Sequence, residues 1–207
     1  MTPLIKICGL TTPEAVEAAS DADFGGFIFY PPSPRHLTPE VAGKLASKLR
    51  PPAVAVTVDA TDSELTEIIK ALSPTYLQLH GKETPARVRE IKEKFGLPVI
   101  KAVGIASGDD AAKAHSFEQD ADMLLFDARP PKGLPGGNGV AFDWRILAHR
   151  TYGKPWFLSG GLDITNVREA VEVSGAGLVD VSSSLESSPG VKDPALVRAF
   201  IQAVKSL

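Results

Sequence analysis

The chain has 207 residues, of which 43% are hydrophobic and 23% charged, and its formal net charge is −3. These values are ordinary for a soluble globular protein. The chain contains no basic block, so its charge gives no support to a nucleic-acid partner. A single cysteine excludes an internal disulfide framework and a metal site built from several cysteines. The first residues do not resemble a secretion signal, and no apolar run approaches the ~18 residues that cross a bilayer, so we expect a cytoplasmic protein without a membrane segment.

Short apolar runs rich in Ile, Val, Leu and Phe recur along the chain, with amphipathic segments between them. They predict eight strands, at residues 4–8, 24–30, 53–58, 76–80, 98–103, 122–127, 155–160 and 177–182. The spacing between successive strands fits one strand, one helix and two short loops. This alternation predicts a parallel sheet with crossover helices.

The segments between the strands carry helix signals. Thr12 and Thr38 are predicted N-caps, and each is followed by proline at the first helical position and then by glutamate. A later helix is expected to end at Gly96, a glycine C-cap. The predicted buried face of the helix that follows Thr38 consists of Val41, Leu45 and Leu49.

Eight strand–helix pairs without a reversal of the pattern predict an α/β fold, a single-domain (β/α)8 TIM barrel that spans residues 1–207. The alternative is an open doubly wound sheet, but no G-x-G-x-x-G motif follows the first predicted strand. In a barrel of this class the functional site lies at the carboxyl ends of the strands, in the loops that lead to the helices.

Polar residues and glycines follow most of the predicted strands, and a closed barrel brings all of these strand ends to one face. The first strand ends at Cys8, the only cysteine of the chain, and Gly9 follows it. The candidate site residues at these ends are Cys8, Arg35, His80, Asp127, Gly160, Gly161, Asp180, Ser182, Ser183 and Ser184. Their convergence on one face predicts a single site.

The last two of these strand ends predict a phosphate-binding site. Gly160 and Gly161 allow the backbone to approach a ligand, and the serines at 182–184 offer N–H and hydroxyl donors where a short helix begins. In (β/α)8 barrels the loops after strands seven and eight frequently bind phosphate through backbone amides. The alternative is a pair of tight turns followed by a helix cap.

Six stretches of the sequence together resemble the phosphoribosylanthranilate isomerase family of tryptophan biosynthesis. They are "KICGL", "SPRHL", "QLHG", "GGNGVAFDW", "LSGGL" with the later "NV", and "DVSSSLESSPGVKD". They run in order from residue 6 to residue 193, nearly the whole chain. The resemblance implies a (β/α)8 barrel that performs an Amadori rearrangement on a phosphorylated sugar–anthranilate substrate, with neither metal nor organic cofactor. The oligomeric state cannot be inferred in this way.

The resemblance also implies that Cys8 is the general base and Asp127 the general acid. A free thiol titrates near 8.5, so the thiolate requires a lowered pKa or a cationic substrate beside it. Lys6 lies on the same side of the strand as Cys8 by the period-2 alternation, and its charge can help. Asp127 must begin the cycle protonated. The alternatives are a small buried hydrophobic role for Cys8 and a capping role for Asp127.

Three further residues take substrate-binding roles by resemblance. Arg35 matches the arginine that meets the anthranilate carboxylate, for which a surface ion pair is the alternative. Asp180 matches an aspartate near the anthranilate amine, or it supports another residue of the site. His80 either orients a neighbour and lines the substrate site, or it is a rim histidine bonded to loop carbonyls.

Two features are less typical of the family. The loop at 128–141 is rich in glycine and is a candidate lid, with a simple connector as the alternative. Ser184 stands where the family more often has glycine. We expect Ser184 to take a helical conformation, since a positive φ would cost it ~1–2 kcal/mol.

Two other functions compete with this interpretation. The histidine-pathway Amadori isomerase shares the fold, but it has an aspartate in place of Cys8 and binds two phosphates, whereas this chain predicts one phosphate site. A binding or scaffold barrel without activity would make Cys8 and Asp127 dispensable.

Overall fold

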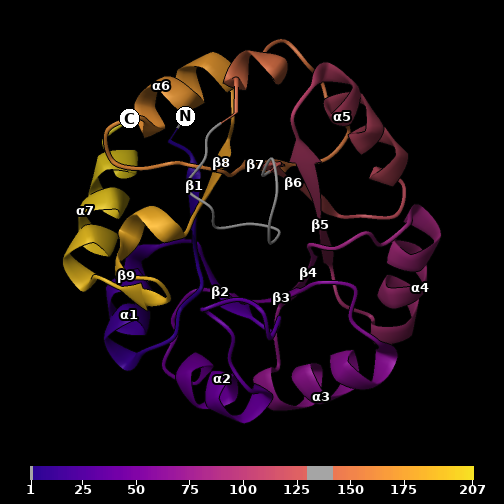
Figure 1. Cartoon of the computed structure of the whole chain (residues 1–207), viewed down its shortest axis with the longest axis vertical. Helices are drawn as coiled ribbons and strands as arrows, with labels where there is room; N and C mark the ends of the chain where they lie inside the picture. Colours follow the sequence, from indigo (N-terminus) through magenta and orange to yellow (C-terminus); the bar gives the residue numbers. More distant parts are fainter. Residues whose placement is uncertain (1, 130–141) are drawn as a thin grey trace.

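The strands form one closed parallel barrel. The structure, a computed structural model, describes residues 2–129 and 142–207. In chain order the strands are β1 (Leu4–Cys8), β2 (Phe24–Ile28), β3 (Ala53–Thr57), β4 (Tyr76–Leu79), β5 (Val99–Ile105), β6 (Met123–Ala128), β7 (Trp156–Leu158) and β8 (Leu178–Val181). Each pairs with its sequence neighbour, and β8 closes the ring on β1 (Figure 1). The prediction of eight strands in a barrel is confirmed, and the open sheet is excluded.

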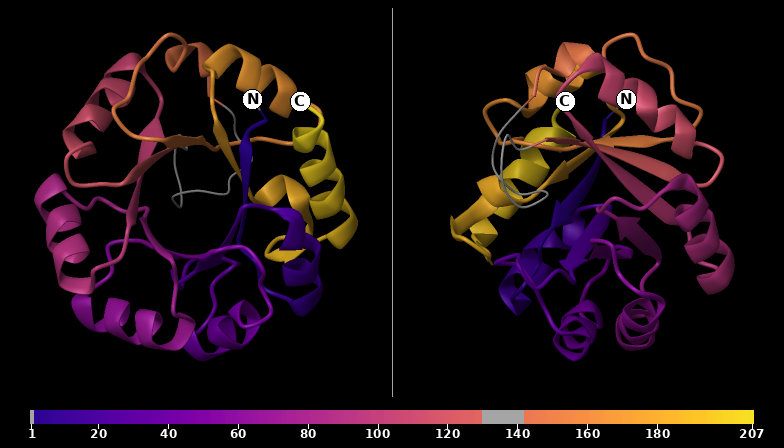
Figure 2. Two further views of the ribbon diagram at one scale, coloured as in Figure 1. Left: turned by 180° about the vertical axis from the view of Figure 1, so that it is seen from behind. Right: turned by 45° about the vertical axis from the view of Figure 1, so that its right-hand side comes forward.

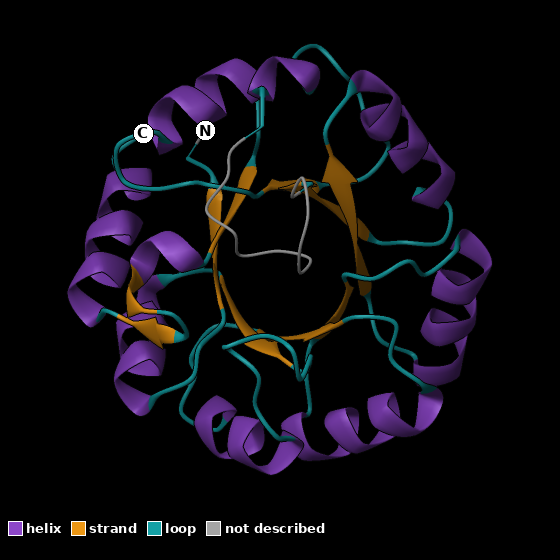
Figure 3. Cartoon of the chain, viewed as in Figure 1, coloured by secondary structure: helices purple, strands orange, loops and turns teal. Residues whose placement is uncertain are grey.

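Helices surround the ring of strands on the outside, as Figure 3 shows. The α-helices are α1 (Pro13–Ala18), α2 (Pro39–Ala46), α3 (Asp62–Leu72), α4 (Pro85–Phe95), α5 (Gly108–Lys113), α6 (Val167–Ser174) and α7 (Pro194–Lys205). Short 3-10 helices are η1 (Ala19–Asp21), η2 (Ala114–Phe117), η3 (Trp144–Ile146) and η4 (Ser183–Leu185). An antiparallel hairpin of β9 (Glu186–Ser188) and β10 (Val191–Lys192) follows η4.

The predicted helix caps are present. Thr12 and Thr38 accept hydrogen bonds from backbone N–H groups in the first turns of α1 and α2. Gly96 closes α4 in the left-handed conformation, with φ 66°. These local signals fix where the crossover helices begin and end, and therefore how long the loops at the barrel rim are.

The predicted buried face of α2 is partly wrong. Leu45 is buried, but Val41 is 43% exposed, and Leu49 lies beyond the end of the helix at Ala46. Ala42 is fully buried instead, and α2 approaches α3 so closely at Gly43 that a Cβ there would collide with the Ala71 carbonyl oxygen. Small residues therefore take the contact face, and Val41 turns to the surface.

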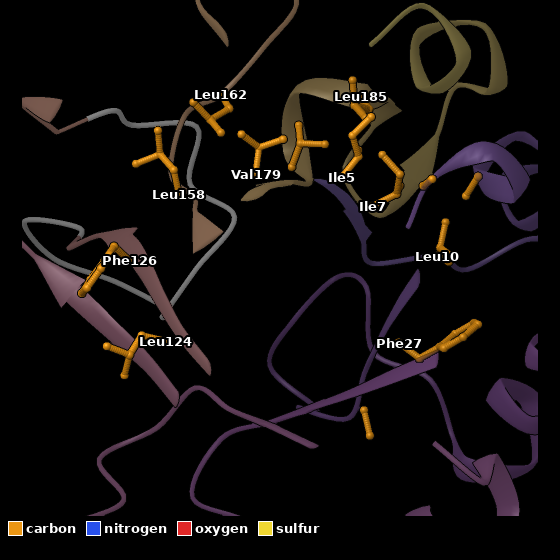
Figure 4. Packing of buried hydrophobic residues seen from close by; sticks show 14 of the residues in the cluster. Ile5, Ile7, Leu10, Phe27, Leu124, Phe126, Leu158, Leu162, Val179 and Leu185 are labelled. Carbon is orange, nitrogen blue, oxygen red and sulfur yellow. The ribbon is translucent and has the colours of Figure 1, made fainter. Parts of the chain in front are cut away.

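Alternate residues of each strand pack on opposite sides of the barrel wall. Ile5 and Ile7 belong to the large cluster between the strands and the helices, part of which is seen in Figure 4. A second cluster fills the barrel interior and includes Phe24, Leu125 and Phe157. In the two views of Figure 2 the helices stay outside the ring throughout. Phe24 and Leu178 of this cluster are the first residues of β2 and β8, so apolar side chains fill the amino end of the barrel.

No helix in the described part of the chain is long and apolar enough to cross a membrane.

Candidate active site

A pocket opens at the carboxyl end of the barrel. Its lining includes six of the ten residues predicted for the site, which are Cys8, Arg35, His80, Asp127, Asp180 and Ser182. The other four, at 160, 161, 183 and 184, directly follow the lining residues Ser159 and Ser182. The residues predicted at the strand ends come from distant parts of the chain and lie together in the structure, as expected.

Cys8 shares the barrel interior with a buried ion pair. Lys6 is fully buried, and its Nζ donates to Asp180 Oδ1 at 2.8 Å. Gly26 in β2 leaves the space for this arrangement, since a Cβ there would lie 3.1 Å from Cys8 Sγ and 3.2 Å from Lys6 Nζ. Ser159 adds a hydrogen bond from its hydroxyl to Asp180 Oδ2 at 3.1 Å. Asp180 is therefore held from both sides beside the thiol.

The environment of Cys8 favours the protonated thiol over the thiolate. Burial raises the pKa of Cys8 above its ordinary value, and the carboxylate of Asp180 adds to this. The charges of Lys6 and Lys192 pull the pKa down but do not outweigh burial. Lys6 itself stays charged, because Asp180 raises its pKa against the effect of burial. The expectation that Lys6 helps the thiolate is right in sign, but Lys6 alone does not produce one.

Asp127 and His80 meet across the pocket. The carboxylate of Asp127 is 3.2 Å from His80 Nε2 through Oδ2, and its Oδ1 accepts the N–H of Ala128 at 2.9 Å. The other ring nitrogen of His80 lies 2.9 Å from Gln78 Nε2. The amide of Gln78 has both a donor and an acceptor, so the ring hydrogen of His80 can lie on either nitrogen, and Nε2 can donate to the Asp127 carboxyl group or accept from it. His80 therefore bonds to two side chains rather than to loop carbonyls, and it orients Asp127.

The loop after His80 is held by a second buried ion pair. Lys101 Nζ donates to Glu83 Oε2 at 2.7 Å and to the carbonyls of Leu79 and Gly81. Glu83 in turn accepts the N–H of Gly81. These bonds fix the backbone on both sides of His80, so the imidazole is carried by a rigid segment of the chain.

Arg35 forms an ion pair, but a buried one. Its Nε and Nη2 donate to the two carboxylate oxygens of Glu186, at 2.6 and 2.8 Å. The Arg35 side chain is 8% exposed and that of Glu186 4%. The surface ion pair considered for Arg35 is therefore wrong in its location, since the pair lies in the wall of the pocket.

The backbone of the two loops predicted to bind phosphate is described by the φ angles at its glycines and serines. Gly160 and Gly161 have φ of 88° and 65°, in the left-handed region that favours glycine. Neither N–H donates to an acceptor within residues 2–129 and 142–207. Ser184 lies in η4 without a positive φ, as expected, and its hydroxyl donates to the Leu162 carbonyl at 2.5 Å. The two loops are thus bonded to each other.

Gly160→Ala tests the fit of the first loop. A Cβ there would lie 2.5 Å from the backbone nitrogen of Ala128 and 3.0 Å from Asp127 Oδ1. We expect kcat to fall by about tenfold, because the end of β6 and its carboxylate must shift. Gly175→Ala is the control, since Gly175 also has a positive φ but nothing within 4 Å. It should lower the melting temperature and leave kcat unchanged; equal kcat in both variants would refute the prediction.

Four residues at the site were not singled out from the sequence. Gln78 and Ser159 face the interior two residues before His80 and one before Gly160, so strand alternation could have found them. Glu186 and Lys192 lie in the last of the six stretches, but their contacts are set by the hairpin, which the strand pattern does not predict. Conversely, the candidate lid at 128–141 lies almost entirely outside the described residues.

No group of three or more His, Cys, Asp or Glu side chains in the described part of the chain is arranged to hold a metal ion.

The fold and the site together define a class, a (β/α)8-barrel protein with a thiol and a carboxylic acid facing one rim pocket beside two glycine- and serine-rich loops. A profile of N-(5'-phosphoribosyl)anthranilate (PRA) isomerase matches residues 5–203. The chain belongs to this family.

Individual relatives agree with the profile. The chain is 49% identical to the N-(5'-phosphoribosyl)anthranilate isomerase of Parvibaculum lavamentivorans, over 99% of both chains. It is 52% identical to that of Nitrobacter winogradskyi, over 100% of this chain and 94% of the relative. Among solved structures, the isomerase from Thermotoga maritima superposes with a TM-score of 0.89 at 35% identity, covering 99% of this chain and 100% of that one. Another, 34% identical with a TM-score of 0.85 and coverage of 99% and 100%, holds reduced 1-(o-carboxyphenylamino)-1-deoxyribulose 5-phosphate.

Proposed function

We propose that the chain isomerises N-(5'-phosphoribosyl)anthranilate to 1-(o-carboxyphenylamino)-1-deoxyribulose 5-phosphate in tryptophan biosynthesis, with Asp127 as acid and Cys8 as base. The observation that carries the proposal is that Cys8 and Asp127 line the same pocket in a member of this family. A cytoplasmic location, expected from the sequence, is part of the proposal.

Asp127 acts first. Its protonated carboxyl group donates a proton to the ring oxygen of the ribose, the bond from that oxygen to C1 breaks, and the nitrogen lone pair forms an iminium at C1. His80 holds the carboxyl group at 3.2 Å and fixes its direction toward the substrate. A positioned proton donor of this kind typically contributes ~10²–10⁴-fold to the rate.

Cys8 acts second. Its thiolate removes the hydrogen of C2, the C–H electron pair forms the C1–C2 double bond, and the π electrons of the iminium return to nitrogen. The enolamine then gains a proton at C1 and loses the proton of its C2 hydroxyl, which leaves a ketone. Burial favours the protonated thiol before substrate binds, so Cys8 must first lose its own proton to solvent. The iminium cation, together with Lys6, provides the charge that favours the resulting thiolate.

The remaining groups bind the substrate. Arg35 faces the anthranilate carboxylate and Asp180 the anthranilate amine. The backbone N–H groups of the loops at 160–161 and 182–184 receive the phosphate, which anchors the sugar between acid and base. No metal or organic cofactor takes part in any of these steps.

Turnover tests the proposal. Purified protein is mixed with freshly generated N-(5'-phosphoribosyl)anthranilate, and the loss of its fluorescence is followed. We expect saturable turnover of this substrate and none of the histidine-pathway substrate with two phosphates. Turnover of the second substrate alone would assign the chain to the competing reaction, and turnover of neither would leave a binding barrel.

A further inference from the structure

The hairpin after β8 contains two charged residues that the mechanism does not use. Glu186 begins β9 and Lys192 ends β10, and the two are partners in the strand register. In Figure 1 the hairpin lies beside α1, and the hydroxyl of Thr11, just before that helix, donates to the Gly190 carbonyl at 2.7 Å. The hairpin is therefore fixed to the rim of the barrel.

Each oxygen of the Glu186 carboxylate accepts two hydrogen bonds. Oε1 accepts from Arg35 Nε and from Lys192 Nζ, both at 2.6 Å. Oε2 accepts from Arg35 Nη2 at 2.8 Å and from the N–H of Gly190 at 3.1 Å. The side chain of Lys192 is fully buried. Four donors on two buried oxygens hold the carboxylate, and through it the guanidinium, in one orientation.

Two glycines shape the space around Arg35. A Cβ on Gly9 would lie 2.6 Å from Arg35 Cδ, so the arginine side chain passes directly over the backbone that follows Cys8. A Cβ on Gly190 would lie 2.3 Å from the Pro34 carbonyl oxygen, so the hairpin packs on the loop that carries Arg35. Arg35 is thus confined by backbone below it and by the hairpin beside it.

We propose that Glu186 is a positioning residue that holds Arg35 by one edge of its guanidinium so that the other edge receives the carboxylate of the substrate. A guanidinium has two edges that can each bind a carboxylate through two nitrogens. Glu186 occupies the edge of Nε and Nη2, and Arg35 lines the pocket. Within the described residues Nη1 has no acceptor. The identity of the second carboxylate rests on the proposed function.

The charges of the cluster matter for the choice of a test variant. Arg35 and Lys192 carry two positive charges and Glu186 carries one negative charge, so the cluster has a net charge of +1. Burial lowers the pKa of Lys192, and Glu186 is the main group that opposes this. Loss of the Glu186 charge is expected to lower the pKa of Lys192 further. A Glu186→Gln variant still tests orientation, because an added positive charge alone would strengthen, not weaken, the binding of the carboxylated ligand.

The experiment measures binding by calorimetry. The ligands are reduced 1-(o-carboxyphenylamino)-1-deoxyribulose 5-phosphate and the same molecule without its carboxyl group. We expect the original chain to prefer the carboxylated ligand, and Glu186→Gln to lose about tenfold of that preference. Its affinity for the ligand without the carboxyl group should change by less than about twofold. If Glu186 had only a structural role, the variant would lose the same factor in affinity for both ligands.

Asp120→Asn is the matched control. Asp120 is also a buried carboxylate that accepts from an arginine, Arg89 Nε at 2.7 Å, but it precedes β6 at the other end of the barrel. This variant should keep the full preference. If Glu186→Gln does not fold, Glu186→Asp replaces it, with a partial loss of preference expected.

The outcomes separate the two proposals. An unchanged preference for the carboxylated ligand in the Glu186 variant overturns the inference and leaves the proposed function intact. Failure of the original chain to bind the carboxylated ligand overturns the proposed function itself.

Discussion

Cys8→Ala is expected to lower kcat by at least about 100-fold, because the variant lacks the thiolate that takes the hydrogen of C2 in the proposed reaction. The variant loses the base but keeps the ion pair of Lys6 and Asp180, which does not depend on the thiol. The measurement is the initial rate of fluorescence loss at saturating N-(5'-phosphoribosyl)anthranilate.

Binding provides the control for this variant. Alanine is smaller than cysteine and fits the same space, so the melting temperature and the affinity for the reduced product should remain near those of the original chain. A Cys8→Ala protein that keeps kcat within about threefold would remove Cys8 from the chemistry and leave it as a small buried residue.

Asp127→Asn is expected to lower kcat by at least about 100-fold as well, since an amide cannot donate a carboxylic proton to the ring oxygen. The amide oxygen can still accept the N–H of Ala128, so the end of β6 should keep its shape. The amide nitrogen would face His80 Nε2, which must then become the acceptor. The rate is measured in the same fluorescence assay.

The matched control is Asp120→Asn, which makes the same chemical change in a buried aspartate at the amino end of β6. It should reduce the melting temperature and leave kcat unchanged. Loss of activity in this control would show that any weakening of the barrel lowers the rate, and the result for Asp127 would then carry no information about acid catalysis.

The location of the site could be predicted from sequence for a simple physical reason. In a closed parallel barrel every strand end lies on one face, so Cys8, His80 and Asp127 needed only correct strand assignments to be brought together. Side-chain direction followed from the alternation along each strand, which places Lys6 on the same side as Cys8. The strand assignments and the alternation of side chains were therefore sufficient to predict where the site lies and which strands contribute to it.

What the sequence could not show depends on contacts between distant segments. The pair of Arg35 and Glu186 joins residues 151 positions apart, and its partners are chosen by the way the hairpin packs on the rim. The pKa of Cys8 depends on burial, which outweighs the charge of Lys6. The helical period predicts Val41 in the core, but α2 and α3 approach each other closely and smaller residues form their contact.

Alkylation of Cys8 tests the account most directly, because the chain has one cysteine and the reaction therefore reports on that thiol alone. Since burial raises the pKa of Cys8, little thiolate is present at neutral pH, and the rate of alkylation by iodoacetamide should rise as the pH increases through and beyond the ordinary thiol range. Loss of isomerase activity should follow the fraction of Cys8 modified, as measured by mass spectrometry, and the reduced product should protect. Complete modification of Cys8 with activity retained would contradict the account.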